Sequence, residues 1–384
     1  MTKRKPNRRD FLTGRAAVQV IADLVPEETP VQNASTPGTK AIAARNTGEE
    51  ADRYLLEVSR RAMACEFHVF LNAGQHAQST EAALAALDLV DSLEDQLSVY
   101  REQSEISSVN RLAAIRPVSV ERRLFGLLQQ AVEITRSTEG AFDITAGPLS
   151  KVWGFHRREG RLPSAPAVRE ALKRVGSQWL TLDSAASSVR FLQTGMEINL
   201  GAIGKGFALD RCAEVLDARG VQDYLIHAGQ SSILARGSRS AGKGSGWSVA
   251  VRHPLKPTVR LAELRLFDRA LGTSGSGNQF FYFQGTRYGH VLDPRTGSSV
   301  EGILSATVLA PNAAQADALS TAFFVLGVDQ VRQFCQNHPD ISAILVCPGH
   351  RKGSLVIHVI QLKDDEWRSL GRVAGREWQI ASGR

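Results

Sequence analysis

The sequence predicts an α+β fold in which helices pack on a mixed, β-rich core. Three observations support this class. Strand-like alternating segments cluster at 223–236, 247–253, 259–267 and 279–284, while most helical patterns precede or follow them. This order lacks the regular strand–helix alternation of a doubly wound parallel sheet. The 384 residues show no internal repeat, and 43% hydrophobic with 22% charged residues is ordinary for a globular protein.

Charge and cysteine content argue against several classes of function. The net charge of +7 comes largely from the two ends of the chain. No basic stripe interleaved with aromatic residues is present, so a nucleic-acid partner is not expected. The four cysteines form no C-x-x-C pair, which argues against a zinc site or a disulfide framework. No apolar run of about 18 residues exists, so no transmembrane segment is predicted.

The first fifty residues precede the expected folded domain. Within residues 1–25, Arg8–Leu12 resembles a twin-arginine export signal, but Arg15 and Asp23 interrupt the apolar segment that should follow. A degenerate or relic signal and a working signal fit this segment equally well. A working signal would place the protein on the exported, periplasmic face, and a relic would leave it cytoplasmic. Residues 26–50 are rich in Pro, Thr, Gly and Glu and are expected to form a disordered linker.

Periodicity predicts the elements of the folded part, which we expect to span residues 51–362. Ser79 is expected to cap the first helix, and Asn312 a later helix that continues to Gly327. Further helical patterns lie at 124–138, 164–176 and 330–337, and further strands at 66–71, 341–347 and 354–362. Residues 363–384 form a C-terminal tail that the pattern leaves unassigned.

Residues 196–220 contain the strongest local signal for ligand binding. A short strand ending at Leu200 is followed by a glycine-rich turn around Lys205 and by a helix that ends near Gly220. This arrangement directs a helix N-terminus at an anion, and lysine adds a positive charge. The glycine spacing matches neither a P-loop nor a dinucleotide-binding fingerprint. A tight connection with a solvated lysine explains the pattern equally well.

Asp317 and Thr321 lie four residues apart in the helix that follows Asn312, so their side-chain oxygens are expected on one face. The rest of this helix is apolar, and a buried carboxylate there needs a partner. A hard cation such as Mg²⁺ would supply one, because it prefers oxygen ligands. Local hydrogen bonds on the helix face are the alternative.

Two further acidic or basic side chains lie next to turns or aromatic residues. His290 and Asp293 flank a strand end and turn, where the histidine could act as a general base or only hydrogen-bond within the turn. Asp143 follows Ala141 and Phe142. It could contact the edge of an adenine or flavin ring, or cap the following turn.

The motifs taken together resemble the FAD:protein FMN transferase family over roughly residues 54–350. The resemblance is carried, in order, by Met63-Ala64, Ser98–Arg101, Ser104–Ile106 with Asn110, Gly140–Asp143, Trp153–Phe155, Asn199–Gly206 with Asp210, Thr273–Gly275, His290–Gly297 and Ala316–Thr321. It implies an α+β fold that binds FAD and Mg²⁺. It also implies that the chain cleaves the FAD diphosphate and attaches FMN to a threonine or serine of a partner protein, typically a membrane redox subunit, with release of AMP.

The resemblance also implies a role for individual residues. His290 corresponds to the histidine implicated in transfer, with Asp293 as the next candidate for the base. The implied FAD contacts are Met63, Tyr100, Ala141, Phe142, Asp143, Asn199, Lys205 and Leu292. The implied Mg²⁺ ligands are the backbone carbonyl of Ala202 and the side chains of Asp317 and Thr321.

Two positions depart from the family pattern. Asn199 stands where the family usually has aspartate, and Ala228–Ser231 replaces its Gly-Gly-Asp or Gly-Gly-Asn turn. Two alternatives to transfer therefore remain. The first is an FAD pyrophosphatase that gives FMN and AMP, and the second is a non-catalytic protein that binds FAD.

Overall fold

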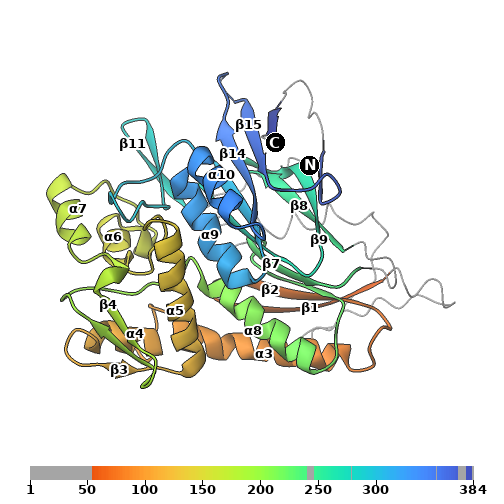
Figure 1. Cartoon of the computed structure of the whole chain (residues 1–384), viewed down its shortest axis with the longest axis horizontal. Coiled ribbons are helices and arrows are strands. Elements are labelled where there is room, and N and C mark those ends of the chain that lie inside the picture. The colour runs from red at the N-terminus through yellow and green to blue at the C-terminus, as the bar shows by residue number, and fades with distance from the viewer. Residues whose placement is uncertain (1–53, 240–245, 278, 352, 371–377, 383–384) are drawn as a thin grey trace, which may run out of the picture. The chain divides into compact units, whose positions relative to one another are not determined.

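A nine-stranded sheet forms the centre of the computed structural model, which describes residues 54–239, 246–277, 279–351, 353–370 and 378–382 (Figure 1). The predicted signal and linker, residues 1–25 and 26–50, lie outside the described residues. The strand order is β1 (Leu55–Ala62), β2 (Cys65–Asn72), β6 (Tyr224–Ala228), β7 (Ser232–Arg236), β10 (Ala270–Gly275), β13 (Ser305–Ala310), β14 (Ser342–Pro348), β15 (Leu355–Ile360) and β17 (Trp378–Ser382). Neighbouring strands are antiparallel, except that β17 runs parallel to β15.

The remaining strands form smaller sheets. One contains β8 (Trp247–His253), β9 (Lys256–Leu266) and β16 (Trp367–Ser369), and it packs on the central sheet through a core that includes Leu225, Trp247 and Leu264. Another contains β3 (Val118–Ser119), β5 (Ser188–Phe191) and β4 (Leu180–Asp183). The strands β11 (Phe280–Phe283) and β12 (Thr286–Gly289) form a separate hairpin.

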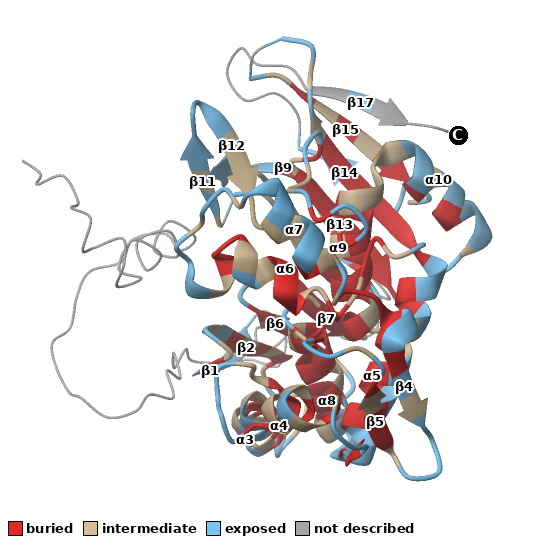
Figure 2. Cartoon of the chain, turned by 90° about the vertical axis from the view of Figure 1, so that its left-hand side faces the viewer, coloured by how far each residue is buried: buried red, intermediate tan, exposed pale blue. Residues whose placement is uncertain are grey.

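Helices cover the other face of the central sheet, because side chains alternate along each strand between two cores. In β6, Tyr224 and Ile226 point into the helical core, whereas Leu225 points towards β8 and β9. The helices are α3 (Ser79–Leu97), α4 (Glu105–Leu112), α5 (Arg122–Ser137), α6 (Gly147–Val152), α7 (Ala165–Leu172), α8 (Gly204–Ala218), α9 (Ala313–Leu326) and α10 (Val328–Asn337), with short 3₁₀ segments at Phe155–Arg157 and Ser177–Trp179. Figure 2 shows the buried residues concentrated where these helices meet the sheet.

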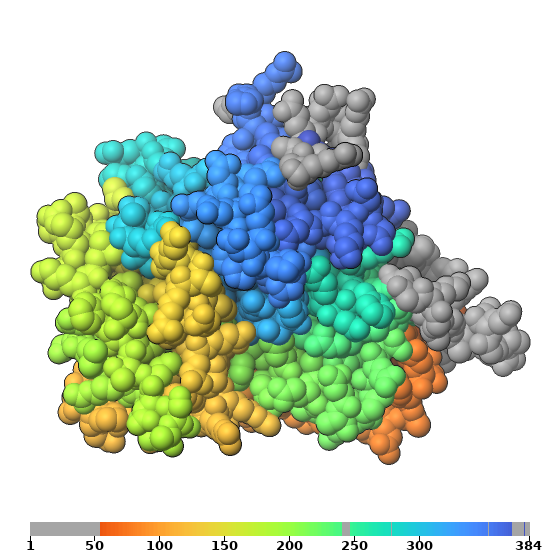
Figure 3. Space-filling model, viewed as in Figure 1, coloured from red at the N-terminus to blue at the C-terminus, as the bar shows by residue number. Residues whose placement is uncertain are grey.

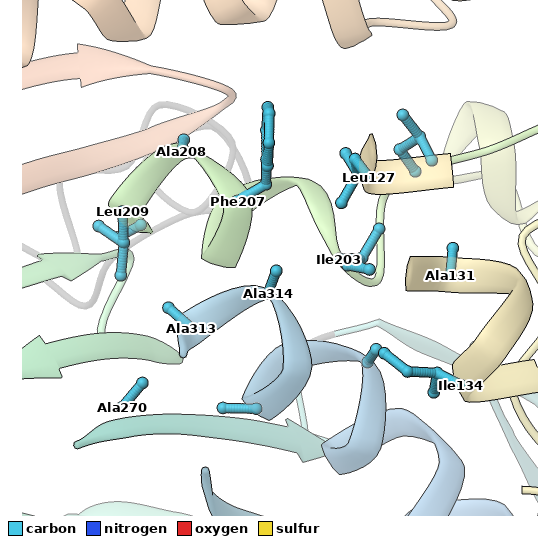
Figure 4. Close-up of a cluster of buried hydrophobic side chains, with 14 of the residues drawn as sticks. Leu127, Ala131, Ile134, Ile203, Phe207, Ala208, Leu209, Ala270, Ala313 and Ala314 are labelled. Carbon is cyan, nitrogen blue, oxygen red and sulfur yellow. The ribbon is translucent and has the colours of Figure 1, made fainter. Parts of the chain in front are cut away.

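The helices α5, α8 and α9 meet in one apolar cluster (Figure 4). Leu127 of α5, Phe207 of α8 and Ala314 of α9 all contribute to it. Ten of the fourteen residues of α9 are buried, in keeping with a helix whose sequence is apolar on most sides. None of the helices that the structure describes is long and apolar enough to cross a bilayer.

The predicted fold class is confirmed, since helices and antiparallel sheets combine as an α+β fold. The cap of α9 is also confirmed, because the Asn312 side chain accepts a hydrogen bond from Gln315 N. The predicted cap of α3 is wrong. A turn in which Ser79 N donates to His76 O starts the helix one residue early, so Ser79 is its first residue and Gln78 lies at the cap.

The strand predicted at 196–200 is wrong as well. The segment forms only an isolated bridge between Glu197 and Ala146. Its backbone is instead paired with a side chain. The Asn110 amide donates to Ile198 O at 2.9 Å and accepts from Ile198 N at 2.8 Å, which occupies the groups that a neighbouring strand would use.

The tail at 363–384, which the sequence leaves unassigned, contains two strands. β16 extends the sheet of β9, and β17 adds to the edge of the central sheet at β15. The predicted strand at 223–236 is a hairpin of β6 and β7, whose turn holds Gly229 and Gln230 at positive φ of 57° and 64°.

Candidate active site

Asp317 is a buried carboxylate in α9, with only 5% of the residue exposed. Its Oδ2 accepts a hydrogen bond of 2.7 Å from Gly206 N, and its Oδ1 accepts one of 2.6 Å from Ser232 Oγ. Burial raises the pKa of the carboxyl, while Lys205 and these two donors oppose the shift. Each oxygen retains a further lone pair, so the carboxylate can still accept another ligand.

Lys205 provides a positive charge beside this carboxylate. It lies in the first turn of α8, and its Nζ is 3.9 Å from Asp317 Oδ2. The Lys205 side chain is 27% exposed, whereas that of Asp317 is 5% exposed. Such an ammonium group, next to a helix N-terminus, is available to a phosphate group that enters from solvent.

The close packing of α8 on α9 brings these two residues together. A Cβ on Gly206 would overlap the carbonyl oxygen of Ala313, so only glycine permits this separation of the two helices. Asp210 fastens the helices again one turn later, since its two carboxylate oxygens accept hydrogen bonds of 2.8 Å from Ala313 N and Ala314 N. Burial raises the pKa of Asp210 to about 6, and these two N–H donors oppose the shift.

Hydroxyl groups surround the next turn of α9. Thr321 Oγ1 lies 3.0 Å from Ser274 Oγ of β10, and Ser274 Oγ lies 2.8 Å from Ser320 Oγ. Thr321 Oγ1 also lies 3.5 Å from Asp317 O, at the upper limit for a hydrogen bond. These hydroxyl groups of α9 and β10 therefore lie about one helical turn along α9 from the Asp317 carboxylate.

His290 follows β12, and Lys205 affects its electrostatic environment. Burial lowers the pKa of His290, and the nearby Lys205 lowers it further, whereas its hydrogen bond to the Gln279 backbone opposes the shift. His290 Nδ1 is 3.1 Å from Gln279 O, a carbonyl that can only accept. Nδ1 therefore carries the proton in the neutral ring, which leaves Nε2 as a proton acceptor.

The Asp293 carboxylate is hydrogen-bonded to Arg295 within the turn that follows His290. Its Oδ1 accepts hydrogen bonds of 2.9 Å from Arg295 N and Arg295 Nε, and its Oδ2 accepts one of 2.9 Å from Arg295 Nη2. Arg295, in turn, packs its side chain against Gly140. The paired carboxylate fixes the turn after His290 and is a weaker candidate for a base than the histidine.

Asp143 organises the loop that precedes α6. Its Oδ1 accepts hydrogen bonds from Thr145 N, Thr145 Oγ1 and Ser177 Oγ, and its Oδ2 accepts one from Ser177 N. This arrangement matches the capping alternative of the sequence analysis. Ala141 and Phe142 are 1% and 2% exposed, so their side chains belong to the core and only their backbone is left for ligand contacts.

The other predicted contacts lie on separate turns. Met63 has a φ of +49° in the turn between β1 and β2, and its N–H donates to Glu94 Oε2 at 2.9 Å. Tyr100 follows α3 and is 68% exposed. Ala202 lies half-buried in the glycine turn, and Leu292 packs against the small cluster of Leu149, Ala171 and Val175.

Comparison with known proteins identifies the family. The family model described as the ApbE family matches residues 63–345. The chain belongs to the ApbE family. This result confirms the resemblance inferred from the motifs.

Several named relatives and solved structures share this similarity. The chain is 29% identical over 308 residues to the FAD:protein FMN transferase of Haemophilus influenzae, covering 78% of this chain and 88% of that one. It is 32% identical over 287 residues to the enzyme of the same name from Treponema pallidum, covering 70% and 78%. The apo structure of the Pseudomonas stutzeri flavinyl transferase ApbE matches with a TM-score of 0.71 and 26% identity, over 80% and 95% of the two chains.

Asn199 holds the glycine turn within the region that the ApbE family model matches. Asn199 Oδ1 accepts a hydrogen bond of 2.9 Å from Gly201 N, and Asn199 N donates to Ile144 O at 2.7 Å. The residue thus ties the glycine turn to the loop organised by Asp143. An amide oxygen can accept the Gly201 hydrogen bond as well as a carboxylate can, but it brings no charge.

The residues fit a magnesium ion of the kind that the ApbE motifs imply. Asp317 and Thr321 offer hard oxygen ligands, and a helix-bound carboxylate with spare lone pairs suits Mg²⁺, which usually completes its shell with water and phosphate oxygens. Among the described residues no group of three or more His, Cys, Asp or Glu side chains could hold a metal ion.

Sequence reasoning missed the serines of this ApbE site. Ser232 binds Asp317, and Ser274 joins Ser320 to Thr321. Ser274 belongs to the motif Thr273–Gly275 that carried the family resemblance, so a signal for it was present. Ser232 lies in an ordinary alternating strand, and nothing in its local sequence distinguishes it.

Proposed function

We propose that this chain transfers FMN from FAD to a threonine or serine of a partner protein, with Mg²⁺ as cofactor and AMP as the leaving group. The observation that carries the proposal is the arrangement around Asp317. A buried carboxylate that accepts hydrogen bonds from Gly206 N and the Ser232 hydroxyl lies beside Lys205 at the N-terminus of α8, in a chain whose named relatives are FAD:protein FMN transferases. This arrangement suits a diphosphate and a hard cation.

Lys205 would bind the FAD diphosphate, because its positively charged side chain lies at the start of α8 and is partly exposed. Asp317, Thr321 and the carbonyl of Ala202 would hold Mg²⁺. When bound, the ion supplies charge neutralisation for the diphosphate and for the departing AMP. The hydrogen bonds from Gly206 and Ser232 would keep the Asp317 carboxylate in one orientation.

His290 would act as the general base. Its Nε2 takes the proton of the acceptor hydroxyl, and the oxygen forms a bond to the phosphorus of the FMN half. The bond between that phosphorus and the bridging oxygen breaks, and AMP leaves with the electron pair. The lowered pKa keeps the ring neutral at pH 7, the form that accepts a proton.

The test separates transfer from its two alternatives. Purified protein is incubated with FAD and Mg²⁺, with and without a candidate acceptor protein, and AMP and protein-bound flavin fluorescence in gels are measured. Transfer requires both AMP and fluorescent acceptor. AMP without labelled protein identifies a pyrophosphatase, and FAD binding without AMP identifies a non-catalytic FAD-binding protein.

The acceptor and the location follow as parts of the same proposal. We expect the acceptor to be a membrane redox subunit, as the family resemblance implies. If Arg8 and Arg9 form a working signal, the reaction takes place on the exported face. Fractionation of cells with an antibody to this chain, together with gel fluorescence of the membrane fraction, tests both points.

A further inference from the structure

The two-residue turn between β1 and β2 has a backbone conformation that its own sequence disfavours. Ala62 pairs with Cys65, so Met63 and Ala64 form the whole loop, and their φ angles are +49° and +59°. Tight hairpin turns commonly have positive φ at both central residues, which asparagine and glycine adopt most readily. Residues with larger side chains are disfavoured there, so a contact from elsewhere in the fold must hold this turn.

Glu94 of α3 supplies that contact. Met63 N donates a hydrogen bond of 2.9 Å to Glu94 Oε2. The other carboxylate oxygen, Oε1, lies 3.2 Å from Arg101 Nη2, and Arg101 also forms an ion pair with Asp95. The Glu94 side chain is 24% exposed, against 66% for that of Asp95, so its carboxylate is partly shielded from water. Both oxygens of Glu94 are therefore used, one on the turn and one on the residue that orients the carboxylate.

The turn packs against a second turn, the one between β6 and β7. A Cβ on Gly229 would lie 3.0 Å from Cys65 Cβ, and Gly229 N donates to Glu66 O at 2.9 Å. Gln230 in this second turn also has a positive φ, of +64°. Three non-glycine residues with positive φ therefore lie on two neighbouring turns. Backbone strain of this kind gathers at ligand sites, where the surrounding structure maintains it.

Both turns lie beside the buried carboxylate of the candidate active site. Ser232, at the start of β7, donates to Asp317 Oδ1 at 2.6 Å. Burial raises the pKa of the Cys65 thiol to about 11. The positive charge of Lys205 opposes this rise, and the carboxylates of Asp317 and Glu94 add to it. In Figure 3 the orange part of the surface, which includes β2 and α3, borders the green part, which includes α8 and β6, along the lower edge.

A connection between two strands would not by itself need this arrangement. An asparagine–glycine turn joins two strands without help from another element. Here a charged residue 31 positions away in the sequence holds the turn, and an arginine in turn orients that residue. The Met63 side chain also packs against the helical core. The turn is thus fixed at both its backbone and its side chain, as expected of a wall that a ligand contacts.

We propose that Glu94 is a positioning residue for FAD. It holds Met63 and Ala64 in the left-handed conformation, and so keeps their turn in place as one wall of the site around Lys205 and Asp317. The inference rests on the proposed function, which assigns FAD to that site. Glu94 acts through the turn and not on the reacting atoms, because Met63 N and Arg101 already occupy its two oxygens.

Loss of Glu94 is expected to change the affinity for FAD and not the chemical step. Without the carboxylate, the turn relaxes to negative φ in most molecules, and a minor fraction keeps the conformation that binds FAD. The apparent Kd rises as that fraction falls, so a binding-competent fraction of ~10% raises Kd ~10-fold. Bound FAD selects the competent conformation, so kcat at saturating FAD stays close to that of the parent.

Ala64→Gly provides the rescue that identifies a positioning role. Glycine adopts positive φ without a steric cost, so the turn of the double variant Glu94→Ala/Ala64→Gly should keep its conformation without the carboxylate. If Glu94 instead contacted FAD directly, or only stabilised the packing of α3, glycine in the turn would not restore FAD binding.

FAD binding, catalysis and stability are measured on the whole chain. Titration of flavin fluorescence in Mg²⁺ gives Kd, AMP release measured by chromatography gives KM and kcat for FAD, and thermal unfolding gives Tm. The variants are Glu94→Ala, Glu94→Gln, Ala64→Gly and the double variant. Glu81→Ala is the matched control, because Glu81 is an exposed acid at the opposite end of α3 from Glu94.

Glu94→Ala should raise Kd and KM for FAD by ~10-fold while kcat changes less than ~2-fold. Glu94→Gln keeps an oxygen that accepts from Met63 N and should bind FAD nearly as the parent does, as should Ala64→Gly and Glu81→Ala. The double variant should return to within ~3-fold of the parent Kd, although it still lacks the ion pair with Arg101. If Glu94→Ala is too unstable to purify, Arg101→Ala replaces it, since that side chain is 45% exposed, and a smaller rise in Kd with the same rescue is expected.

Two results would overturn the proposal. The first is a parental Kd for FAD in Glu94→Ala, whatever its Tm. The second is a weakened Kd that Ala64→Gly does not restore, because Glu94 would then act by direct contact or through general stability.

Failure of the proposed function gives a different pattern. FAD binding that depends on Glu94 and is rescued by Ala64→Gly, in a protein that transfers no FMN, supports the positioning role and refutes transfer. FMN transfer by a parent whose Glu94→Ala variant binds FAD normally supports transfer and refutes the positioning role. A parent that binds no FAD refutes both.

Discussion

Gly206 N donates a hydrogen bond of 2.7 Å to Asp317 Oδ2, so the first turn of α8 holds the buried carboxylate of α9. The positive end of the α8 dipole faces that carboxylate and favours its ionised form. Burial acts in the opposite direction and raises its pKa. A bound cation would favour the ionised carboxylate. Substitution of Asp317 is therefore the most direct test of the site.

Asp317→Asn should reduce AMP release by ~10²–10³-fold and weaken FAD binding in Mg²⁺, because the variant keeps the shape of the side chain but not its charge. AMP release is measured by chromatography, and FAD binding by fluorescence. EDTA should have the same effect on the parent and little further effect on the variant. FAD cleavage that continues unchanged in EDTA would refute the assignment of the metal site.

Thr321→Ala should be milder than Asp317→Asn, since a neutral hydroxyl contributes less to cation binding than a carboxylate. Thr321→Ser should retain most activity because it keeps the oxygen that lies near Ser274. The measurement is the Mg²⁺ concentration that gives half-maximal AMP release. Equal Mg²⁺ requirements for the parent and Thr321→Ala would remove Thr321 from the site.

Lys205→Ala should weaken FAD binding by ~10–100-fold, the value expected for loss of one charge-assisted hydrogen bond. Riboflavin binding should change little, because riboflavin has no phosphate for the ammonium group to contact. The parent should likewise bind FAD more tightly than FMN, which lacks the diphosphate. Equal affinities for the two flavins, measured by titration calorimetry, would argue against this diphosphate site.

His290→Ala should lower FMN transfer by ~10²–10⁴-fold and leave FAD binding intact, because a general base acts on the transition state. Burial lowers the pKa of His290, so the neutral ring persists below the ordinary value of 6.5. The acidic limb of the transfer rate should therefore fall below pH 6.5. Asp293→Asn is the comparison variant, and a larger loss for it than for His290→Ala would move the base to Asp293.

His227 should make the fold sensitive to acid. Burial, with smaller effects from His68 and Arg252, lowers the pKa of His227 to about 4, and its buried Nδ1 has no hydrogen-bond partner. The unfolded residue titrates near 6.5, so His227 is neutral in both the folded and unfolded states above that pH. As pH falls from 6.5 to about 4, the unfolded residue takes up a proton and the folded one does not, and the folded state loses stability. The loss amounts to about 3 kcal/mol at most.

Urea unfolding at pH 7.0, 5.5 and 4.5 measures this effect. His227→Phe should show a flatter dependence of the unfolding free energy on pH, because the ring that packs on His68 and Phe70 no longer titrates. His350→Gln, at an exposed position, is the control and should follow the parent. Parallel curves for the parent and His227→Phe would contradict the prediction.

The local sequence predicted most helices and strands. It failed where a side chain from a distant part of the chain takes the hydrogen bonds that a neighbouring strand would otherwise make. The cap of α9 by Asn312 follows from neighbouring residues, and the structure has it. The segment 196–200 alternates like a strand, yet Asn110, 88 residues away, takes up its backbone groups. Likewise, β17 depends on its partner β15, and its own short sequence carries no signal.

The sequence by itself determined the α+β class, the family and the residue types of the candidate site, because periodicity and motif order are properties of the linear chain. Only the tertiary structure decided which of those residues share a site. It brings Lys205 to 3.9 Å from Asp317 and adds Ser232 to the same carboxylate. It also shows that the Asp293 carboxylate accepts a hydrogen bond from Arg295 Nη2. These relationships depend on the packing of α8 on α9 and on strand register, which bring together residues from distant parts of the chain.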